Sequence, residues 1–261
     1  MSIETFILGG VIAGFFAGMF GIGGGAVVIP ILTHFYRSMG MNTTESIRLA
    51  FGTSLAAMAF TGASSFLSHK KNGNVDFFWF KKLMLPPVIG AAIGGLIAAR
   101  VNGVWLAIGL SIMLGYFGIK LILQREQEVE AWPWLEKYSH AAGLFSGLTY
   151  SLAGMGGASV MTFYLTKVGV PLRKAIGTAT GLILPISIGT IIGFGVVAGL
   201  PHDWRWGYID LYALLVLSPC AIIAAKVGVR VANFLPIKQL RKMFGFLMFL
   251  LAGKVLLDVF L

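Results

Sequence analysis

The sequence has few charged residues and a single cysteine. Charged residues make up 11% of the chain and hydrophobic residues 57%, and the mean hydropathy is +0.86. This composition leaves too little polar surface to coat a soluble domain, so we expect an all-α integral membrane protein that crosses the bilayer several times. The lone cysteine, Cys220, excludes a disulfide within the chain.

Several kinds of functional site are also missing. None of the ten Asp and Glu residues lies in the middle of an apolar run, which argues against a cation site or a proton relay inside the membrane. The four histidines are scattered without ligand spacing, so we expect no bound metal. No nucleophile motif, P-loop or dinucleotide fingerprint occurs, so we expect neither an enzyme nor a cofactor. The net charge of +10 comes from basic residues in short loops, a pattern typical of membrane orientation and not of nucleic-acid binding.

Glycine, in contrast, is abundant and is concentrated at two points. Residues 21–25 (Gly-Ile-Gly-Gly-Gly) lie in the middle of an apolar segment that runs from about residue 6 to residue 36. Four glycines in five residues are unfavourable in a regular helix, so this stretch predicts a break between two half-helices. Such a break puts free N–H groups and the positive end of a helix inside the membrane, where they suit an anion. Residues 154–158 (Gly-Met-Gly-Gly-Ala) interrupt a second apolar segment, 138–167, in the same way.

The surroundings of the two breaks repeat as well. Residues 48–53 (Arg-Leu-Ala-Phe-Gly-Thr) resemble residues 173–178 (Arg-Lys-Ala-Ile-Gly-Thr), and Lys120 and Lys254 close the two halves, at offsets between 125 and 134 residues. This pattern indicates an internal duplication of the whole chain. The expected units are an N-terminal membrane repeat at 1–123, a cytoplasmic linker at 124–137 and a C-terminal membrane repeat at 138–261.

Apolar runs that could span about 30 Å of hydrocarbon occur at six other places. They are residues 47–68, 79–100, 103–123, 174–199, 208–229 and 240–260. If each glycine-broken segment is a hairpin that enters and leaves on one side, each repeat keeps three full spans. An odd number of spans gives the two repeats opposite orientations. We therefore expect two inverted-topology repeats, each a glycine-broken, re-entrant helix pair plus three transmembrane helices.

The basic residues favour this topology. With both termini outside the cytoplasm, fifteen of the twenty Lys and Arg residues fall on the cytoplasmic side and five on the other, as the positive-inside rule requires. The five are Arg37, Arg48, Arg100, Arg205 and Lys254. If the glycine-broken segments crossed the membrane instead, this charge bias would weaken.

Candidate substrate-binding residues follow from the breaks and from the duplication. They are Gly21, Gly23, Gly24 and Gly25 in the first break, Gly154, Gly156 and Gly157 in the second, and Thr53, Ser54 and Thr178 in the helices that follow. Backbone N–H groups and hydroxyls would hold an oxyanion without placing a full positive charge in the bilayer. Arg48 and Arg173 would gather anions at two entrances. Alternatively, the glycines only let helices pack closely, the hydroxyls bond to their own helices and the arginines snorkel to the interface.

The motifs resemble those of a known family. Residues 18–25 (Gly-Met-Phe-Gly-Ile-Gly-Gly-Gly) followed by Pro30, residues 154–157 (Gly-Met-Gly-Gly) and the paired Gly-Thr elements are similar to the TauE/SafE sulfite exporter family of anion permeases. The resemblance covers essentially the whole chain. It implies a multi-pass protein of the bacterial inner membrane that moves sulfur-containing oxyanions such as sulfite, sulfoacetate, sulfonates or thiosulfate. The second half departs from the pattern, with Ala158 opposite Gly25 and Phe163 opposite Pro30, so the two half-sites need not be equivalent.

The expected function is therefore export of small sulfur-containing oxyanions by alternating access to a central anion site. The expected partners are the small anionic substrate and the lipid bilayer, and a homo-oligomer is compatible with the sequence. Two alternatives stay open. An anion channel would share the amide site, and a membrane accessory protein without transport of its own would use the glycines for packing alone.

Overall fold

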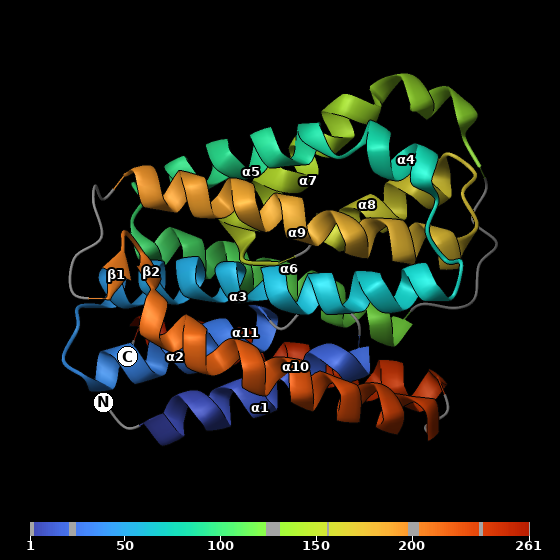
Figure 1. Cartoon of the computed structure of the whole chain (residues 1–261). Coiled ribbons are helices and arrows are strands. Elements are labelled where there is room, and N and C mark those ends of the chain that lie inside the picture. The colour runs from blue at the N-terminus through green and yellow to red at the C-terminus, as the bar shows by residue number, and fades with distance from the viewer. Residues whose placement is uncertain are drawn as a thin grey trace.

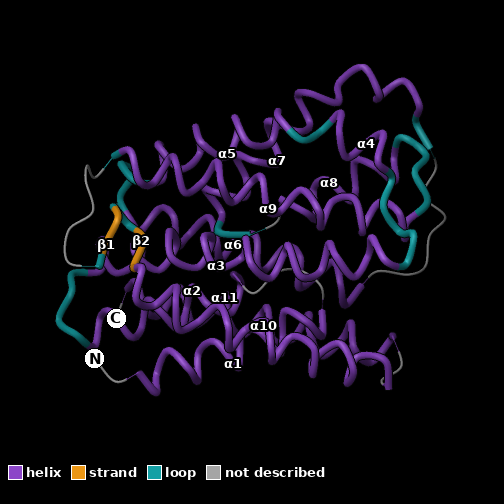
Figure 2. The backbone as a smooth tube through the Cα atoms, in the orientation of Figure 1, coloured by secondary structure: helices purple, strands orange, loops and turns teal. Residues whose placement is uncertain are grey.

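The computed structural model describes most of the chain, and nearly all of what it describes is helical (Figures 1 and 2). The described residues are 3–20, 25–123, 131–155, 157–197, 204–234 and 237–260. The helices are α1 (Ile3–Phe20), α2 (Gly25–Ser38), α3 (Thr43–Lys71), α4 (Phe77–Lys82), α5 (Leu85–Ala98), α6 (Gly103–Leu123), the 3₁₀ helix η1 (Pro133–Tyr138), α7 (Ser139–Ala153), α8 (Gly157–Lys167), α9 (Leu172–Val196), α10 (Leu211–Phe234) and α11 (Ile237–Phe260). Strands β1 (Arg205–Trp206) and β2 (Ile209–Asp210) form a small antiparallel hairpin.

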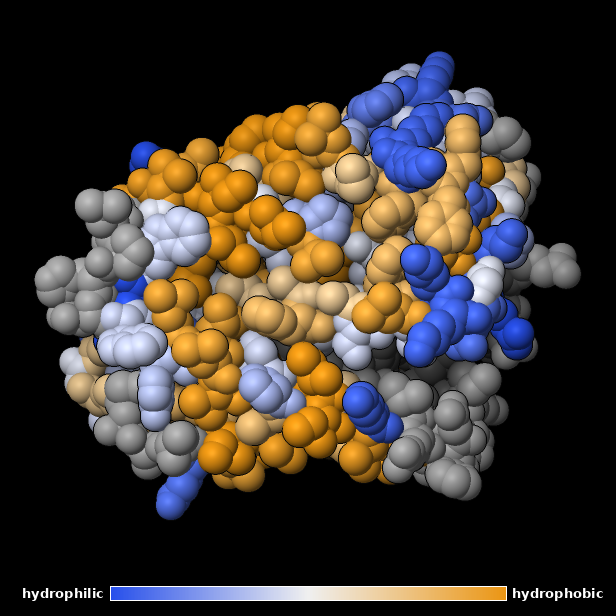
Figure 3. Space-filling model, viewed as in Figure 1, coloured by the Kyte–Doolittle hydropathy of each residue, from blue (hydrophilic) through white to orange (hydrophobic). Residues whose placement is uncertain are grey.

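The structure has the helices of a membrane protein. Within the described residues, four stretches are helical, long and apolar enough to cross a bilayer: Thr43–Lys71, Gly103–Lys120, Leu172–Val196 and Leu211–Gly228. Large apolar side chains such as Ile93, Ile188 and Leu215 are exposed on the outside of the molecule. Figure 3 shows apolar side chains across the middle of one face and hydrophilic ones gathered towards the end where α4 lies. The chain is therefore an all-α integral membrane protein.

The predicted span at 79–100 is wrong as a single helix. The structure divides it between α4 and α5, and α5 has 14 residues, fewer than the roughly 20 that a span requires. Pro86 and Pro87 explain the division, because a proline lacks the backbone N–H that a helix interior needs and is tolerated in the first turn. Four of the other five predicted runs overlap the candidate spans in α3, α6, α9 and α10, and the fifth, 240–260, lies in α11, which is helical but is not among those candidates.

Both glycine-broken segments fold back on themselves. The ring of Phe6 near the start of α1 packs at 4.8 Å between centroids against Phe35 near the end of α2, so the two helices run antiparallel. In the second segment, the Tyr164 hydroxyl on α8 donates to the carbonyl of Leu135, just before α7, at 3.0 Å. Each helix pair therefore leaves and returns at the same end of the molecule, and the two pairs do so at opposite ends (Figure 1).

The two halves of the chain interlock. Helix α1 packs along α10, α7 packs along α5, and the long helices α3 and α9 pack against each other at the centre. Glycine makes the first two contacts close, because a Cβ at Gly14 would collide with the backbone of Ala221 and one at Gly147 with the backbone of Pro87. The first helix of each half is thus held by the other half.

Candidate functional site

The two glycine breaks meet inside the protein. Gly154 ends α7 in the left-handed conformation, with φ of +69°, which favours glycine. Gly25, the first residue of α2, lies against it: a Cβ added at Gly25 would be 2.8 Å from the carbonyl oxygen of Gly154. Segments about 130 residues apart in sequence therefore come together, and α2 begins beside the end of α7.

Not every predicted glycine can be placed. Gly21, Gly23, Gly24 and Gly156 lie outside the described residues. Gly157 begins α8 and is tightly packed, because a Cβ there would be 2.9 Å from the Cβ of Tyr150 and 3.0 Å from the carbonyl oxygen of Ser146. A substitution at Gly157 would thus disturb packing as well as any ligand.

One face of α3 lines the meeting point. Phe51 and Met58 lie on either side of it. The Phe51 ring is 2.9 Å from the position that a Cβ would take at Gly154, and the Met58 sulfur is 2.7 Å from the position of a Cβ at Gly25. Ser54 is three residues after Phe51 and four before Met58, so it shares their face of the helix. Its side chain is completely buried, and its hydroxyl finds no hydrogen-bond partner within the described part of the chain.

A second group of hydroxyls lies on α7 and α9. The Tyr150 hydroxyl donates to the carbonyl of Leu55 at 3.2 Å and lies 2.8 Å from Ser187 Oγ. Ser146, one turn before Tyr150, is fully buried and, like Ser54, has an Oγ without a partner among the described residues. Sequence reasoning missed Ser146, Tyr150 and Ser187. Their signal was a polar side chain in an otherwise apolar membrane helix, which is rare without a partner or a role.

Thr53 and Thr178 hold the two halves together instead of facing the breaks. Thr53 Oγ1 accepts a hydrogen bond from the backbone N–H of Asp210 at 2.9 Å, and Thr178 Oγ1 accepts one from the N–H of Asp76, also at 2.9 Å. The residue before each threonine is a glycine that packs closely against a backbone carbonyl. A Cβ at Gly52 would collide with the carbonyl of Tyr208, and a Cβ at Gly177 would collide with that of Asn74. These two matched contacts lie at opposite ends of the molecule, near β2 and near α4 (Figure 1).

Asp76 and Asp210 are a pair that sequence reasoning missed. Each caps a helix: Asp76 Oδ1 accepts from the N–H of Phe78 at 3.1 Å, and Asp210 Oδ1 accepts from that of Ala213 at 2.9 Å. Asp210 is 4% exposed and its Oδ2 also accepts a hydrogen bond from the Tyr36 hydroxyl at 3.1 Å. The available signal was the spacing of 134 residues, which equals that between Lys120 and Lys254.

The two candidate entrance arginines differ. Arg48 is engaged at the end of the molecule that holds the termini: Nε donates to the carbonyl of Val101 at 2.9 Å, Nη2 to that of Arg100 at 2.9 Å, and Nη1 to the Tyr208 hydroxyl at 3.0 Å. These bonds anchor loops. Arg173 is exposed at the other end, near the start of α9.

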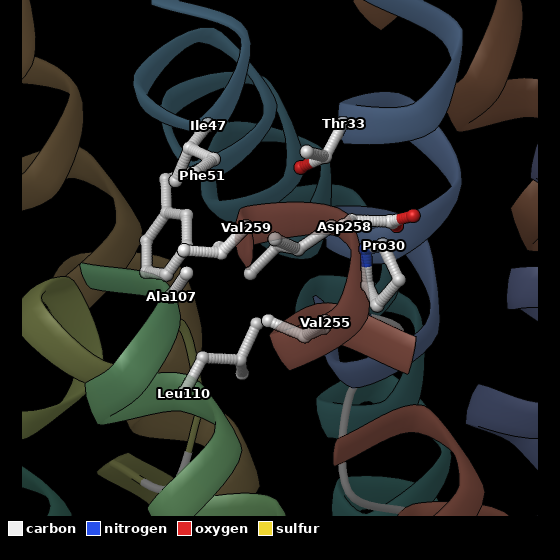
Figure 4. Close-up of a pocket in the computed structure, with 10 residues that line it drawn as sticks. Pro30, Thr33, Ile47, Phe51, Ala107, Leu110, Val255, Asp258 and Val259 are labelled. Carbon is white, nitrogen blue, oxygen red and sulfur yellow. The ribbon is translucent and has the colours of Figure 1, made fainter. Parts of the chain in front are cut away.

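A small crevice lies beside the meeting point, between α2, α3, α6 and α11 (Figure 4). Figure 4 shows Phe51, Ala107 and Leu110 facing Thr33 and Pro30 across it. Ile29 and Phe51 line the crevice, and their side chains also pack directly against Gly154. These two side chains therefore separate the crevice from the glycine breaks. Its carboxylate, Asp258, is paired with Lys254 at 2.8 Å. Across the described residues there is no group of three or more His, Cys, Asp or Glu side chains that could hold a metal.

Comparisons with known proteins give a consistent assignment. The sequence model of the family described as "Sulfite exporter TauE/SafE" matches residues 6–255. The chain is 30% identical to a "Probable membrane transporter protein" of Haemophilus influenzae, over 98% of this chain and 97% of that protein. It is 26% identical to proteins with the same description from Methanocaldococcus jannaschii, covering 92% of this chain and 90% of the relative, and from Bacillus subtilis, covering 94% and 96%. No solved structure gives a significant match. On this evidence, the chain belongs to the TauE/SafE family of membrane transporters.

Proposed function

We propose that the protein exports small sulfur-containing oxyanions, such as sulfite, sulfoacetate or related sulfonates, from a bacterial cell across the inner membrane. The observation that carries this proposal is the Ser54 hydroxyl, which is fully buried, shares a helix face with the two side chains that contact the breaks, and has no hydrogen-bond partner among the described residues. A buried hydroxyl without a partner is costly, and a ligand that accepts its hydrogen bond offsets that cost. The family description supplies sulfite as the kind of substrate.

The site has the elements that an oxyanion requires. Helices α2 and α8 begin at the breaks, and the first turn of a helix has free N–H groups and a partial positive charge. Neutral donors of this kind bind an anion without the desolvation cost of a buried Lys or Arg. In this proposal the glycines of the breaks let the substrate approach the backbone closely, and Ser54 and Ser146 add hydroxyl donors.

We further propose that the chain consists of two inverted repeats, 1–123 and 138–261, joined by the cytoplasmic linker 124–137. The support is the antiparallel course of each glycine-broken pair and the matched Thr–Asp contacts, one at each end. Alternating access would open one of these contacts at a time, so that the central site faces one side and then the other. Both contacts are made in this structure.

Export follows from electrostatics alone under this proposal. The side to which this topology assigns fifteen of the twenty Lys and Arg residues would face the cytoplasm. A membrane potential that is negative inside drives an anion outwards by about 2.3 kcal/mol per charge per 100 mV. No coupling ion is then needed.

The direct test is flux in proteoliposomes that hold the purified protein, with sulfite, sulfoacetate and acetate as substrates. We expect saturable flux of the sulfur oxyanions that responds to an imposed potential, and no acetate flux above that of liposomes without protein. Flux that rises linearly without saturation would indicate a channel. Absence of flux by folded protein would contradict transport and favour an accessory role.

A further inference from the structure

The central site has no positively charged side chain in its walls. The six helices around it are α1, α2, α3, α7, α8 and α9, and their residues 5–20, 25–33, 49–68, 141–153, 157–166 and 175–196 include no Lys, Arg, His, Asp or Glu. Arg48 lies in the second turn of α3, outside these residues, and donates to loop carbonyls at one end of the molecule. Any negative charge in the site is therefore met only by dipoles.

The dipoles that converge on the site can be counted. A helix N-terminus is equivalent to about half of a positive elementary charge. Helix α2 begins at Gly25 and α8 at Gly157, and Gly25 lies against Gly154, three residues before the start of α8. The C-terminal ends of α1 and α7, at Phe20 and Ala153, also lie at the breaks and carry partial negative charge, so the helix ends together supply at most roughly one positive charge. At most, this compensates a single negative charge, and it leaves a second one uncompensated.

Two buried hydroxyls without partners among the described residues lie on helices beside the two breaks. Ser54 and Ser146 are both fully buried, and neither Oγ has a hydrogen-bond partner within the described part of the chain. Ser54 shares a helix face with Phe51 and Met58, whose side chains contact the two breaks. The carbonyl of Ser146 lies 3.0 Å from the position of a Cβ at Gly157, where α8 begins. Hydroxyls can donate to oxygen atoms of a ligand but add no net charge.

We infer that the site selects oxyanion groups that carry one negative charge, such as a sulfonate or hydrogen sulfite, and discriminates against dianionic groups such as sulfate or fully ionised sulfite. The physical reason is the desolvation cost of an ion, which grows with the square of its charge, while its favourable interaction with the helix ends grows only in proportion to that charge. This inference rests on the proposed function, because it names the charge state of the substrate of that same site.

The test compares methanesulfonate, a permanent monoanion, with sulfate, a dianion of similar shape, in proteoliposomes at matched ionic strength and zero imposed potential. We expect methanesulfonate to move at least about tenfold faster than sulfate at equal subsaturating concentration. Sulfite flux at constant total concentration should fall when the buffer is made more alkaline, in proportion to the loss of the monoanion, while methanesulfonate flux stays constant.

The outcomes separate this inference from the proposal on which it rests. Equal rates for sulfate and methanesulfonate, or sulfite flux that rises in alkaline buffer, would overturn the selection of monoanions while leaving sulfur-oxyanion transport intact. Absence of flux for all three substrates, by protein shown to be folded, would overturn both.

Discussion

At the scale of the residue, neighbouring hydroxyls have different surroundings. Thr53 and Ser54 are adjacent, yet successive side chains of a helix point about 100° apart. The Thr53 hydroxyl therefore meets the N–H of Asp210, while Ser54, on the face of α3 that contacts the breaks, has no partner among the described residues. The sequence predicted both residues as candidates and could not separate them, because the rotation of α3 about its axis is set by packing against α2, α9 and α10.

Replacing Ser54 by Ala tests the role of its hydroxyl. The change removes a buried polar group that has no partner in the described structure, so we expect the melting temperature of the substrate-free protein in detergent to stay the same or rise. Substrate affinity should fall by roughly tenfold or more, because a hydrogen bond to a charged group contributes about 1.5–3 kcal/mol. Ser218→Ala is the matched control, since Ser218 is also buried and unpartnered among the described residues but lies on α10. Equal affinity in both variants would remove Ser54 from the site.

At the scale of the element, the Thr–Asp contacts join helices of one half to a loop of the other. Thr53 on α3 binds the start of α10, and Thr178 on α9 binds the start of α4. The duplication of Gly-Thr was visible in the sequence, but its backbone partners were not, because short connections such as residues 72–76 and the turn and strand at 207–210 carry no periodic pattern. Their position follows from the interlocking of the two halves.

Thr53→Val and Thr178→Val test these contacts. Valine has nearly the same shape as threonine but leaves the N–H of Asp210 or Asp76 without an acceptor, at a cost of about 1–3 kcal/mol. We expect each variant to lower the melting temperature in detergent, and the two losses to be similar. The control is Thr61→Val, because the Thr61 hydroxyl donates within its own helix, to Met58 at 3.2 Å. If Thr61→Val lowers the melting temperature by as much, the contacts between the halves contribute no more to stability than a hydrogen bond within one helix.

At the scale of the whole molecule, the sequence predicted more of the architecture than of the site. The glycine runs predicted two helix breaks, and α7 and α8 are indeed separated by Gly154 in a left-handed conformation. Apolar runs predicted the long helices, except where Pro86 and Pro87 divide one of them. The lining of the site could not be predicted, because Tyr150 and Ser187 are brought together only by the packing of α7 on α9.

The most direct measurement of the central claim is the accessibility of position 54 from each side of the membrane. Because Cys220 is the sole cysteine, a Ser54→Cys, Cys220→Ser variant carries a single thiol, and it is first shown to retain flux. A membrane-impermeant thiol reagent is then added to one side or the other of proteoliposomes, with and without saturating methanesulfonate. Alternating access to one anion site predicts labelling from either side and slower labelling from both when the sulfonate is present. Labelling from one side only, or labelling that the sulfonate leaves unchanged, would contradict the account.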